Sequence, residues 1–344
     1  MSTPSAEGEL GWYLRNALHS EASAELLKPI ADAAAGVLGT AAPGGTAEEL
    51  ERALAALPSS QASAEPLERN ARFAAAEFNL VQAELDILLL ALRLRRGRQL
   101  ARFCSAVQGV LRDPSRVIAA LLGRDLDTVQ ECVAPGSRLC LCGLIVFDAD
   151  DIYDSGFASI LAVSRAAAGA MLATHADRDG WRAALIGRPC EPGLPWESFD
   201  HLGAVAPLAA RVLAAAAAAS EEGIHILLAG PPGTGKTEFA RALAARAGLA
   251  LYATGEEADA EGSEPSRSVR GTALRLSLAL LRQRRDAAVL LDEAEDVLDG
   301  RDRSAHGGTP FPRCSSIARW SGRRCRCCGP ATTSAGWTWR HCGA

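Results

Sequence analysis

A glycine-rich loop between an apolar strand pattern and a helix pattern constrains this chain more than any other feature. Residues 224–229 form a short apolar run of the kind that becomes a buried parallel strand. The run leads into residues 230–237, whose sequence GPPGTGKT fits the pattern G-x-x-x-x-G-K-[ST]. Residues 238–248 then continue with helical periodicity. Strand, loop and helix in this order predict a phosphate-binding turn.

The residue types of this loop suit an anion. Glycines let the backbone wrap closely and point several N–H groups at phosphate oxygens, next to a helix N-terminus. Lys236 would place a positive charge on the outer phosphates, where it also assists catalysis, and the Thr237 hydroxyl would bind Mg²⁺. The residues that we expect to bind the phosphate-bearing ligand are Gly230, Pro231, Pro232, Gly233, Thr234, Gly235, Lys236, Thr237 and Glu238.

The rarity of lysine argues against a chance glycine turn. Lysine occurs only at positions 28 and 236, whereas arginine supplies the other 34 of the 36 basic residues. One of the two lysines therefore stands at the position where the phosphate-binding pattern requires it.

A second apolar strand pattern ends in two acids. Residues 287–291 are apolar and are followed by Asp292 and Glu293, 56 residues after Lys236. The carboxyl ends of parallel strands form the edge at which ligands bind in such sheets. We expect Asp292 to hold Mg²⁺ through a water molecule and Glu293 to polarise an attacking water as a catalytic base.

Together the two elements resemble those of the AAA+ ATPases, over about residues 196–300. The resemblance implies ATP as the ligand, and ATP hydrolysis coupled to remodelling of a protein partner that the sequence does not identify. It also implies a homo-oligomeric ring, and an adenine pocket lined by residues 199–203, including Leu202 and Gly203. Members that thread polypeptides carry an aromatic pore loop between the two motifs. Residues 255–265 are acidic and contain no aromatic residue, so we do not expect threading by that grip.

The resemblance sets the expected fold. It implies an α/β P-loop NTPase core with a parallel sheet flanked by helices, here incomplete, over residues 196–302. We expect a helical arm in residues 1–70, a mainly α-helical, winged-helix-like domain in residues 71–150 and linker helices in residues 151–195. The remaining residues, 303–344, are expected to form a disordered tail.

The winged-helix interpretation rests on helix patterns followed by a small hairpin. Residues 113–123 read as a helix that starts at Asp113-Pro114 and ends at Gly123, and residues 125–132 read as a short helix in the recognition position. Residues 137–147 read as one or two strands. The short helix is acidic, which disfavours contact with phosphate, so an ATP-dependent DNA-binding module is the alternative rather than the leading function.

Composition limits the remaining possibilities. The net charge is -5, so the chain as a whole has no general attraction to nucleic acid or anionic membranes. The longest apolar run, residues 212–219, is too short to span a bilayer, and no secretory leader is visible, so we expect a cytoplasmic location without a membrane partner. Five cysteines scattered before residue 200 are expected to be reduced thiols.

The segment after Asp302 departs from the family pattern. From Arg301 onward the chain holds eight arginines, one acid and five cysteines without strand or helix periodicity. A basic tail for nucleic acid, a cysteine metal knuckle and a shifted reading frame are the alternatives. A shifted frame joins the last base of each codon to the first two bases of the next codon. In that frame the codons of Cys327 and Cys328 must give Leu, those of Trp337 and Thr338 must give Asp, and those of His341 and Cys342 must give Leu. The recovered pattern resembles the family's sensor strand, which ends in Thr-x-Asn. We therefore hypothesise a frameshift between Asp302 and Cys314.

The hypothesis has a mechanistic consequence. In the family, a sensor asparagine, an arginine finger and a helical lid complete the γ-phosphate site, and the chain as printed shows none of them after Asp302. Loss of an arginine finger can cost about 10³ to 10⁵ in rate. We expect nucleotide binding with poor hydrolysis, and an inactive truncated product is the limiting alternative.

Overall fold

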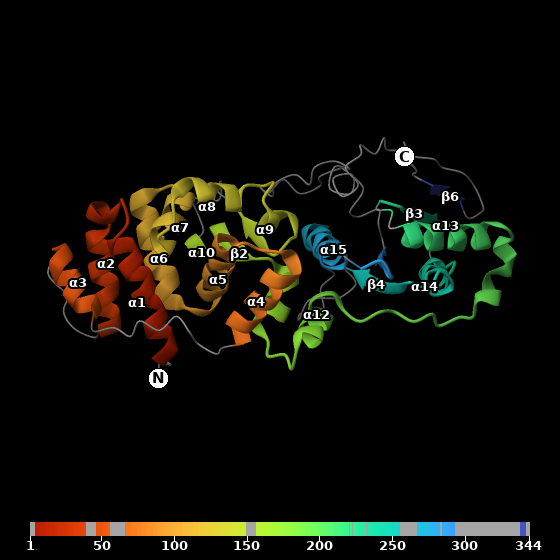
Figure 1. Ribbon diagram of the computed structural model, residues 1–344, viewed down its shortest axis with the longest axis horizontal. Helices are drawn as coiled ribbons and strands as arrows, with labels where there is room; N and C mark the ends of the chain where they lie inside the picture. The colour runs from red at the N-terminus through yellow and green to blue at the C-terminus, as the bar shows by residue number, and fades with distance from the viewer. Residues whose placement is uncertain are drawn as a thin grey trace. The chain divides into compact units, whose positions relative to one another are not determined.

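The computed structural model describes residues 4–38, 46–55, 66–148, 156–219, 221, 223–231, 233–254, 267–282, 284–292 and 338–341. The chain divides into two compact units, residues 1–185 and 186–344, which are described separately (Figure 1). The expected segment boundaries within these units remain predictions.

The first unit is mainly helical. Its helices are α1 (Pro4–Leu18), α2 (Ser23–Leu38), α3 (Ala47–Ala55), α4 (Pro66–Phe78), α5 (Gln82–Arg96), α6 (Arg98–Leu111), α7 (Pro114–Leu122), α8 (Leu126–Val133), α9 (Arg138–Leu141), α10 (Phe157–Ile160) and α11 (Arg165–Leu172). Helix α12 (Arg178–Ile186) reaches the boundary between the units. The strands are β1 (Ile145–Phe147) and β2 (Leu161–Val163), which pair antiparallel.

Local capping explains the clearest helix boundaries. The Asp113 side chain accepts a hydrogen bond from the Ser115 N–H at 2.8 Å, and Pro114 occupies the first turn of α7. Gly123 ends the helix in the left-handed conformation, with φ of 60°. The predicted start and end of this helix are confirmed.

Of the one or two strands expected in residues 137–147, the structure confirms one, β1, and the expected hairpin within this range is wrong. The Ser137 hydroxyl accepts a hydrogen bond from the Cys140 N–H at 3.4 Å, so residues 138–141 form helix α9 instead of a strand. Strand β1 finds its partner later in the chain, with Ile145 opposite Val163. The winged-helix interpretation is therefore not confirmed, because residues 137–147 do not form the wing.

Helix α8, the expected recognition helix, has an acidic N-terminus with a structural role. The Asp125 carboxylate accepts a hydrogen bond from the Thr128 N–H at 2.7 Å, and this bond lowers the pKa of Asp125. The carboxylate is thus charged at neutral pH at the helix end that would approach DNA. This arrangement works against phosphate contact.

A buried ion pair joins α4 and α5. Arg93 Nη2 donates to Glu68 Oε1 at 2.8 Å, and the two side chains are only 8% and 9% exposed. Arg93 Nη1 also donates to the Tyr13 hydroxyl at 3.1 Å, which brings α1 into the network. A charged group in such an interior is stable only while its partner is present.

Replacing Glu68 by alanine should therefore destabilise the first unit by about 3–5 kcal/mol, because the Arg93 guanidinium would be left buried without its carboxylate. Urea unfolding followed by circular dichroism measures the effect. Glu51→Ala is the matched control, since Glu51 pairs with His19 where both side chains are more than half exposed, 61% and 62%. That control should cost no more than about 1 kcal/mol. Equal losses in the two variants would contradict the prediction.

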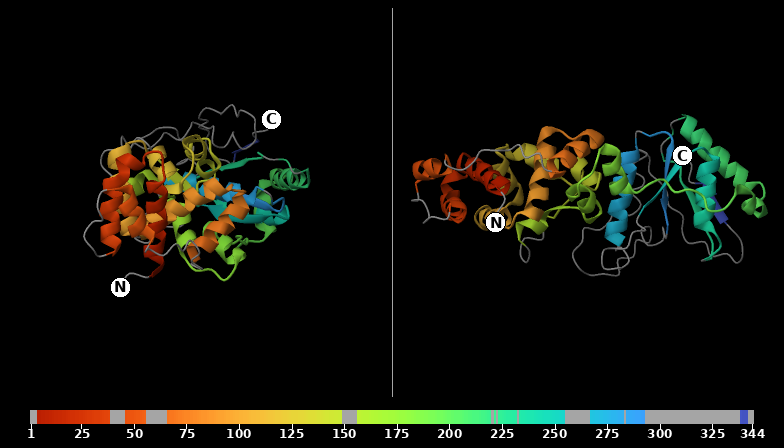
Figure 2. Two further views of the ribbon diagram at one scale, coloured as in Figure 1. Left: turned by 60° about the vertical axis from the view of Figure 1, so that its left-hand side comes forward. Right: turned by 90° about the horizontal axis from the view of Figure 1, so that it is seen from below.

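The second unit contains the elements expected for the phosphate-binding core. They are the 3₁₀ helix η1 (Trp196–Leu202), α13 (Val205–Ala219), β3 (Ile226–Ala229), α14 (Lys236–Arg246), β4 (Ala250–Thr254), α15 (Arg267–Leu281), β5 (Ala287–Leu291) and β6 (Thr338–His341). Strands β4 and β5 are parallel, from Ala250 opposite Ala287 to Thr254 opposite Leu291, and α15 is the crossover between them. The right-hand view of Figure 2 shows this pair between α15 on one face and α14 on the other.

The pairing of β3 corrects two expectations. We expect one parallel sheet containing both motif strands, but β3 pairs antiparallel with β6, with Ile226 opposite His341. Among the described residues, β3–β6 and β4–β5 are separate two-stranded sheets. The expectation of a disordered tail is also wrong for the four residues of β6, which pair with β3 along its whole length.

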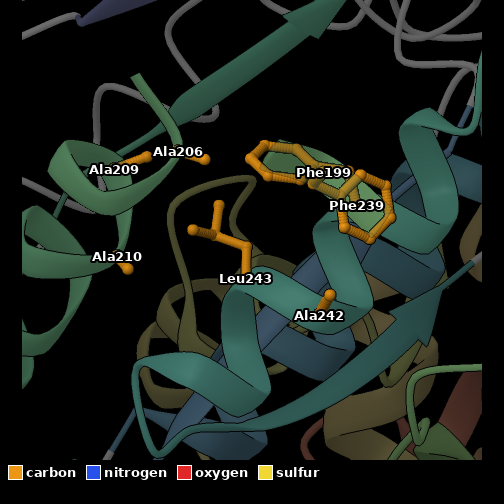
Figure 3. Close-up of a cluster of buried hydrophobic side chains, with 7 residues drawn as sticks. All are labelled: Phe199, Ala206, Ala209, Ala210, Phe239, Ala242 and Leu243. Atoms are coloured by element: carbon orange, nitrogen blue, oxygen red, sulfur yellow. The ribbon is translucent and has the colours of Figure 1, made fainter. Parts of the chain in front are cut away.

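An aromatic and alanine-rich core holds α14 in place. Phe199 of η1 and Phe239 of α14 are 4% and 2% exposed, and their ring centroids lie 5.2 Å apart. Figure 3 shows these rings side by side, with Leu243 directed toward the small side chains of α13. The buried alanines of α13 are Ala206, Ala209 and Ala210. Small residues on α13 leave room for the bulky face of α14.

Within the described residues, no single helix is long and apolar enough to cross a membrane. The pair η1 and α13, bent by 117°, meets the length and composition criteria only when the two helices are taken together.

The five cysteines before residue 200 are free thiols in this structure, as expected. They are Cys104, Cys132, Cys140, Cys142 and Cys190. Burial raises the pKa of the Cys142 thiol to about 12 and raises that of Cys104 further. These two thiols therefore stay protonated and unreactive at neutral pH.

Candidate functional site

The glycine-rich loop follows β3 directly and ends at the first residue of α14. Gly233 and Gly235 have φ values of 76° and 80°, in the left-handed region that side chains other than glycine rarely adopt. Gly235 is also the N-cap of α14, so the loop delivers Lys236 and Thr237 to the first helical turn. Pro232 lies outside the described residues. This backbone path explains why glycines stand at positions 233 and 235.

The Lys236 side chain folds back and contacts the start of the loop. Its Nζ donates to the Gly230 carbonyl at 3.0 Å and to the Pro231 carbonyl at 2.9 Å. The Thr234 hydroxyl donates to the same Pro231 carbonyl at 2.9 Å. The ammonium is thus held beside the loop by weak neutral acceptors. Phosphate oxygens carry more negative charge and would form stronger hydrogen bonds with it.

Thr237 and Asp292 connect the two motif strands. The Thr237 hydroxyl donates to Asp292 Oδ2 at 2.6 Å, across 55 positions in the sequence. Thr237 lies one residue into α14, and Asp292 follows the last residue of β5. The contact therefore brings the end of β5 to the first turn of α14, although β3 and β5 lie in separate two-stranded sheets among the described residues.

The donor set formed by Thr237 and Asp292 fits a hard divalent cation. A hydroxyl and a carboxylate oxygen in direct contact are ligand types that Mg²⁺ prefers. Over the part of the chain that the structure describes, no group of three or more His, Cys, Asp or Glu side chains gathers around a possible metal position. That sparse set suits Mg²⁺, which usually takes one or two protein ligands and completes its shell with water and phosphate.

Other residues predicted for the site are Glu293, Leu202 and Gly203. Glu293, the expected catalytic base, lies outside the described residues, as does the acidic segment 255–265. Leu202 is partly buried against the core around Phe239, and Gly203 ends η1 with φ of 56°. Both expected adenine-pocket residues are thus positioned by packing of η1 on the helix that carries Lys236.

Glu238 is engaged away from the loop. Its Oε2 accepts a hydrogen bond from the Gly193 N–H at 2.9 Å, and its Oε1 accepts one from Arg241 at 2.7 Å. From the sequence, Glu238 is expected among the ligand-binding residues. Its contacts instead point to the linker before η1. Sequence reasoning missed Gly193, because the Pro/Gly composition of residues 187–195 indicates a linker but not its contacts.

Comparison with known proteins agrees with this geometry. Residues 226–310 match the family described as "ATPase family associated with various cellular activities (AAA)". This segment belongs to the AAA ATPase family. It contains the loop, α14, the β4–β5 pair and Asp292, which are the elements that form the site.

One relative gives independent support. A stretch of 87 residues is 41% identical to the ATP-dependent zinc metalloprotease FtsH 1 of Symbiobacterium thermophilum. The stretch covers 24% of this chain but only 14% of that protein, so the chain spans a small part of the relative that it matches. The match supports an AAA ATPase segment and does not transfer the relative's other activities. No solved structure matches the chain significantly.

Proposed function

We propose that residues 230–237 and Asp292 bind ATP together with Mg²⁺. The observation that carries the proposal is the 2.6 Å contact between Thr237 and Asp292, which joins the first turn of α14 to the end of β5 beside Lys236. Membership of the AAA family in residues 226–310 supports nucleotide binding as the general activity.

Different residues of the proposed site would bind the phosphates, the metal ion and the attacking water. The loop N–H groups and Lys236 hold the phosphates, and the left-handed glycines allow the backbone to approach them. Thr237 and Asp292 would hold Mg²⁺, which when bound neutralises charge on the phosphate oxygens. Glu293 follows Asp292 at the strand end, where its carboxylate would orient a water molecule and accept a proton from it.

Asp292→Asn tests the metal-binding part of the proposal. The variant should need about tenfold more Mg²⁺ for half-maximal nucleotide binding, because the amide replaces a charged oxygen beside Thr237. A fluorescent ATP analogue titrated at several Mg²⁺ concentrations gives this value. Asp286→Asn is the control, since Asp286 is exposed and pairs with Arg284 at the other end of β5. A shift of the same size in both variants would argue against a metal ligand at Asp292.

We further propose that the intact protein couples ATP hydrolysis to remodelling of a protein partner within a homo-oligomeric ring. Two observations support this: the family match and the first unit, which supplies a separate helical body on the same chain. The structure does not favour the DNA-binding alternative. Residues 138–141 form a helix instead of part of the expected wing, and the N-terminus of α8 is acidic.

We also propose that the 3′ reading frame is shifted after Asp302. The family match ends at residue 310, between Asp302 and Cys314 where the codon constraints place the shift. Resequencing the 3′ end of the gene tests the idea, and an intact frame without a nearby insertion or deletion would refute it.

The proposed frameshift predicts slow turnover by this chain. Without an arginine finger, hydrolysis should be about 10³- to 10⁵-fold slower than in an intact enzyme of this kind. A phosphate-release assay with saturating ATP and Mg²⁺ measures the rate. Vigorous turnover that disappears in Glu293→Gln would show that the chain has a complete catalytic site and would contradict the prediction.

A further inference from the structure

The first turn of α14 faces two different partners. Lys236 contacts the carbonyls of the glycine loop, and Thr237 contacts Asp292. The next two residues turn to the linker: Glu238 accepts a hydrogen bond from Gly193, and Phe239 stacks against Trp196. Four consecutive residues of one helical turn thus connect the proposed phosphate site to the linker.

The linker segment 190–196, which we call the strap, is held at three points. The Cys190 N–H donates to the Leu251 carbonyl of β4 at 2.6 Å, forming an isolated antiparallel bridge. Gly193 donates to Glu238 at 2.9 Å in the middle of the strap. At the end of the strap, the ring centroids of Trp196 and Phe239 lie 6.2 Å apart. Arg246, on the same helix as Phe239, has its Cζ atom 5.8 Å from the Trp196 ring centroid.

The middle of the strap lies on the surface. Residues 191–195 are all exposed and form no helix or strand. The Gly193 contact is also close, because a Cβ added there would meet Glu238 Oε2 at 3.0 Å. Arg241, one helical turn after Glu238, holds the other carboxylate oxygen at 2.7 Å and fixes the orientation of the group. The carboxylate is therefore the central attachment of an exposed segment.

We propose that Glu238 is a positioning residue that couples docking of the strap to nucleotide binding. The proposal rests on the proposed function, since it requires a nucleotide at Lys236 and Thr237. A nucleotide that orders the first turn of α14 also orders Glu238 and Phe239, which hold the strap. A docked strap in turn orders the turn that binds the nucleotide, and such coupling is reciprocal by linkage. The strap begins shortly after the boundary at residue 185. Nucleotide binding would therefore change the order of the segment that connects the second unit to the first.

Two measurements on the full chain test this coupling. The first is the affinity for a slowly hydrolysed ATP analogue in the presence of Mg²⁺. The second is hydrogen exchange of peptides covering residues 188–196, with and without that analogue. In the wild type the analogue should slow exchange in the strap. Glu238→Ala should weaken affinity at least about fivefold, the lower end of ordinary coupling, and should abolish the slowing by the analogue.

Three further variants separate the possible causes. Glu238→Gln keeps an oxygen that can accept from Gly193, so it should restore part of the strap protection that alanine removes. Lys236→Ala should remove the response of the strap to the analogue but leave its protection in the free protein unchanged. Glu191→Ala removes an exposed carboxylate from the strap itself and should change neither measurement.

The outcomes distinguish the two proposals. If the wild type binds no nucleotide, the proposed function fails and the coupling fails with it. If the wild type binds the analogue and Glu238→Ala binds it equally tightly, with strap exchange still slowed by the analogue, only the coupling is overturned. If Glu191→Ala has the effect of Glu238→Ala, general charge accounts for the result and the assigned role of Glu238 is also overturned.

Discussion

Replacing Lys236 by alanine is expected to weaken ATP binding by about 10- to 100-fold. Hydrogen bonds to charged groups contribute about 1.5–3 kcal/mol, and each factor of ten in affinity corresponds to about 1.4 kcal/mol. The Lys236 ammonium lies against the Gly230 and Pro231 carbonyls, within the loop that would surround the phosphates. A fluorescent ATP analogue displaced by unlabelled ATP gives the affinity.

The chain provides a matched control for this variant. Lys28 is the other lysine in the sequence, and it is exposed on α2 in the first unit. Lys28→Ala removes the same functional group and the same charge without altering the loop. ATP affinity should therefore stay at the wild-type value in that variant. If both variants weakened binding equally, a general charge effect would replace the assigned role of Lys236.

Replacing Phe239 by alanine should destabilise the second unit by about 3–5 kcal/mol, the usual cost of truncating a buried phenylalanine. Phe239 is 2% exposed and contacts the rings of Phe199 and Trp196. The loss is a large share of the stability of about 5–15 kcal/mol that a folded domain has. Hydrogen exchange of peptides from α14 during urea unfolding reports this unit separately from the first.

Leu227→Ala is the control for the core prediction. Leu227 lies on β3 and is 46% exposed, so its truncation removes an apolar side chain that is only partly buried. It should cost about 1 kcal/mol or less. A Phe239→Ala variant no less stable than Leu227→Ala would show that the aromatic cluster does not hold α14.

Local chemistry made several elements predictable from the sequence. Asp113, Pro114 and Gly123 define α7 because a cap, a fixed φ angle and a left-handed residue each act within a few residues. The glycine loop was predictable for the same reason, since Gly233 and Gly235 adopt backbone angles that the motif requires.

Features that depend on distant partners were not predictable. Residues 138–141 are apolar enough for a strand, but the Ser137 cap and the pairing of β1 with β2 decide otherwise. The antiparallel partner of β3 comes from more than a hundred residues later in the chain. The contact of Gly193 with Glu238 spans 45 positions and leaves no local pattern. The β1–β2, β3–β6 and Gly193–Glu238 contacts each join residues that are far apart in the sequence, whereas the Ser137 cap is local.

Calorimetric titration of the wild-type chain with a slowly hydrolysed ATP analogue tests whether the glycine loop binds a nucleotide. We predict saturable binding of about one nucleotide per chain that weakens when Mg²⁺ is removed, because Thr237 and Asp292 meet at the predicted metal position. Absence of saturable binding would contradict the assignment of the loop as a nucleotide site. Binding of equal strength with and without Mg²⁺ would contradict the assignment of Thr237 and Asp292 as the metal-binding pair.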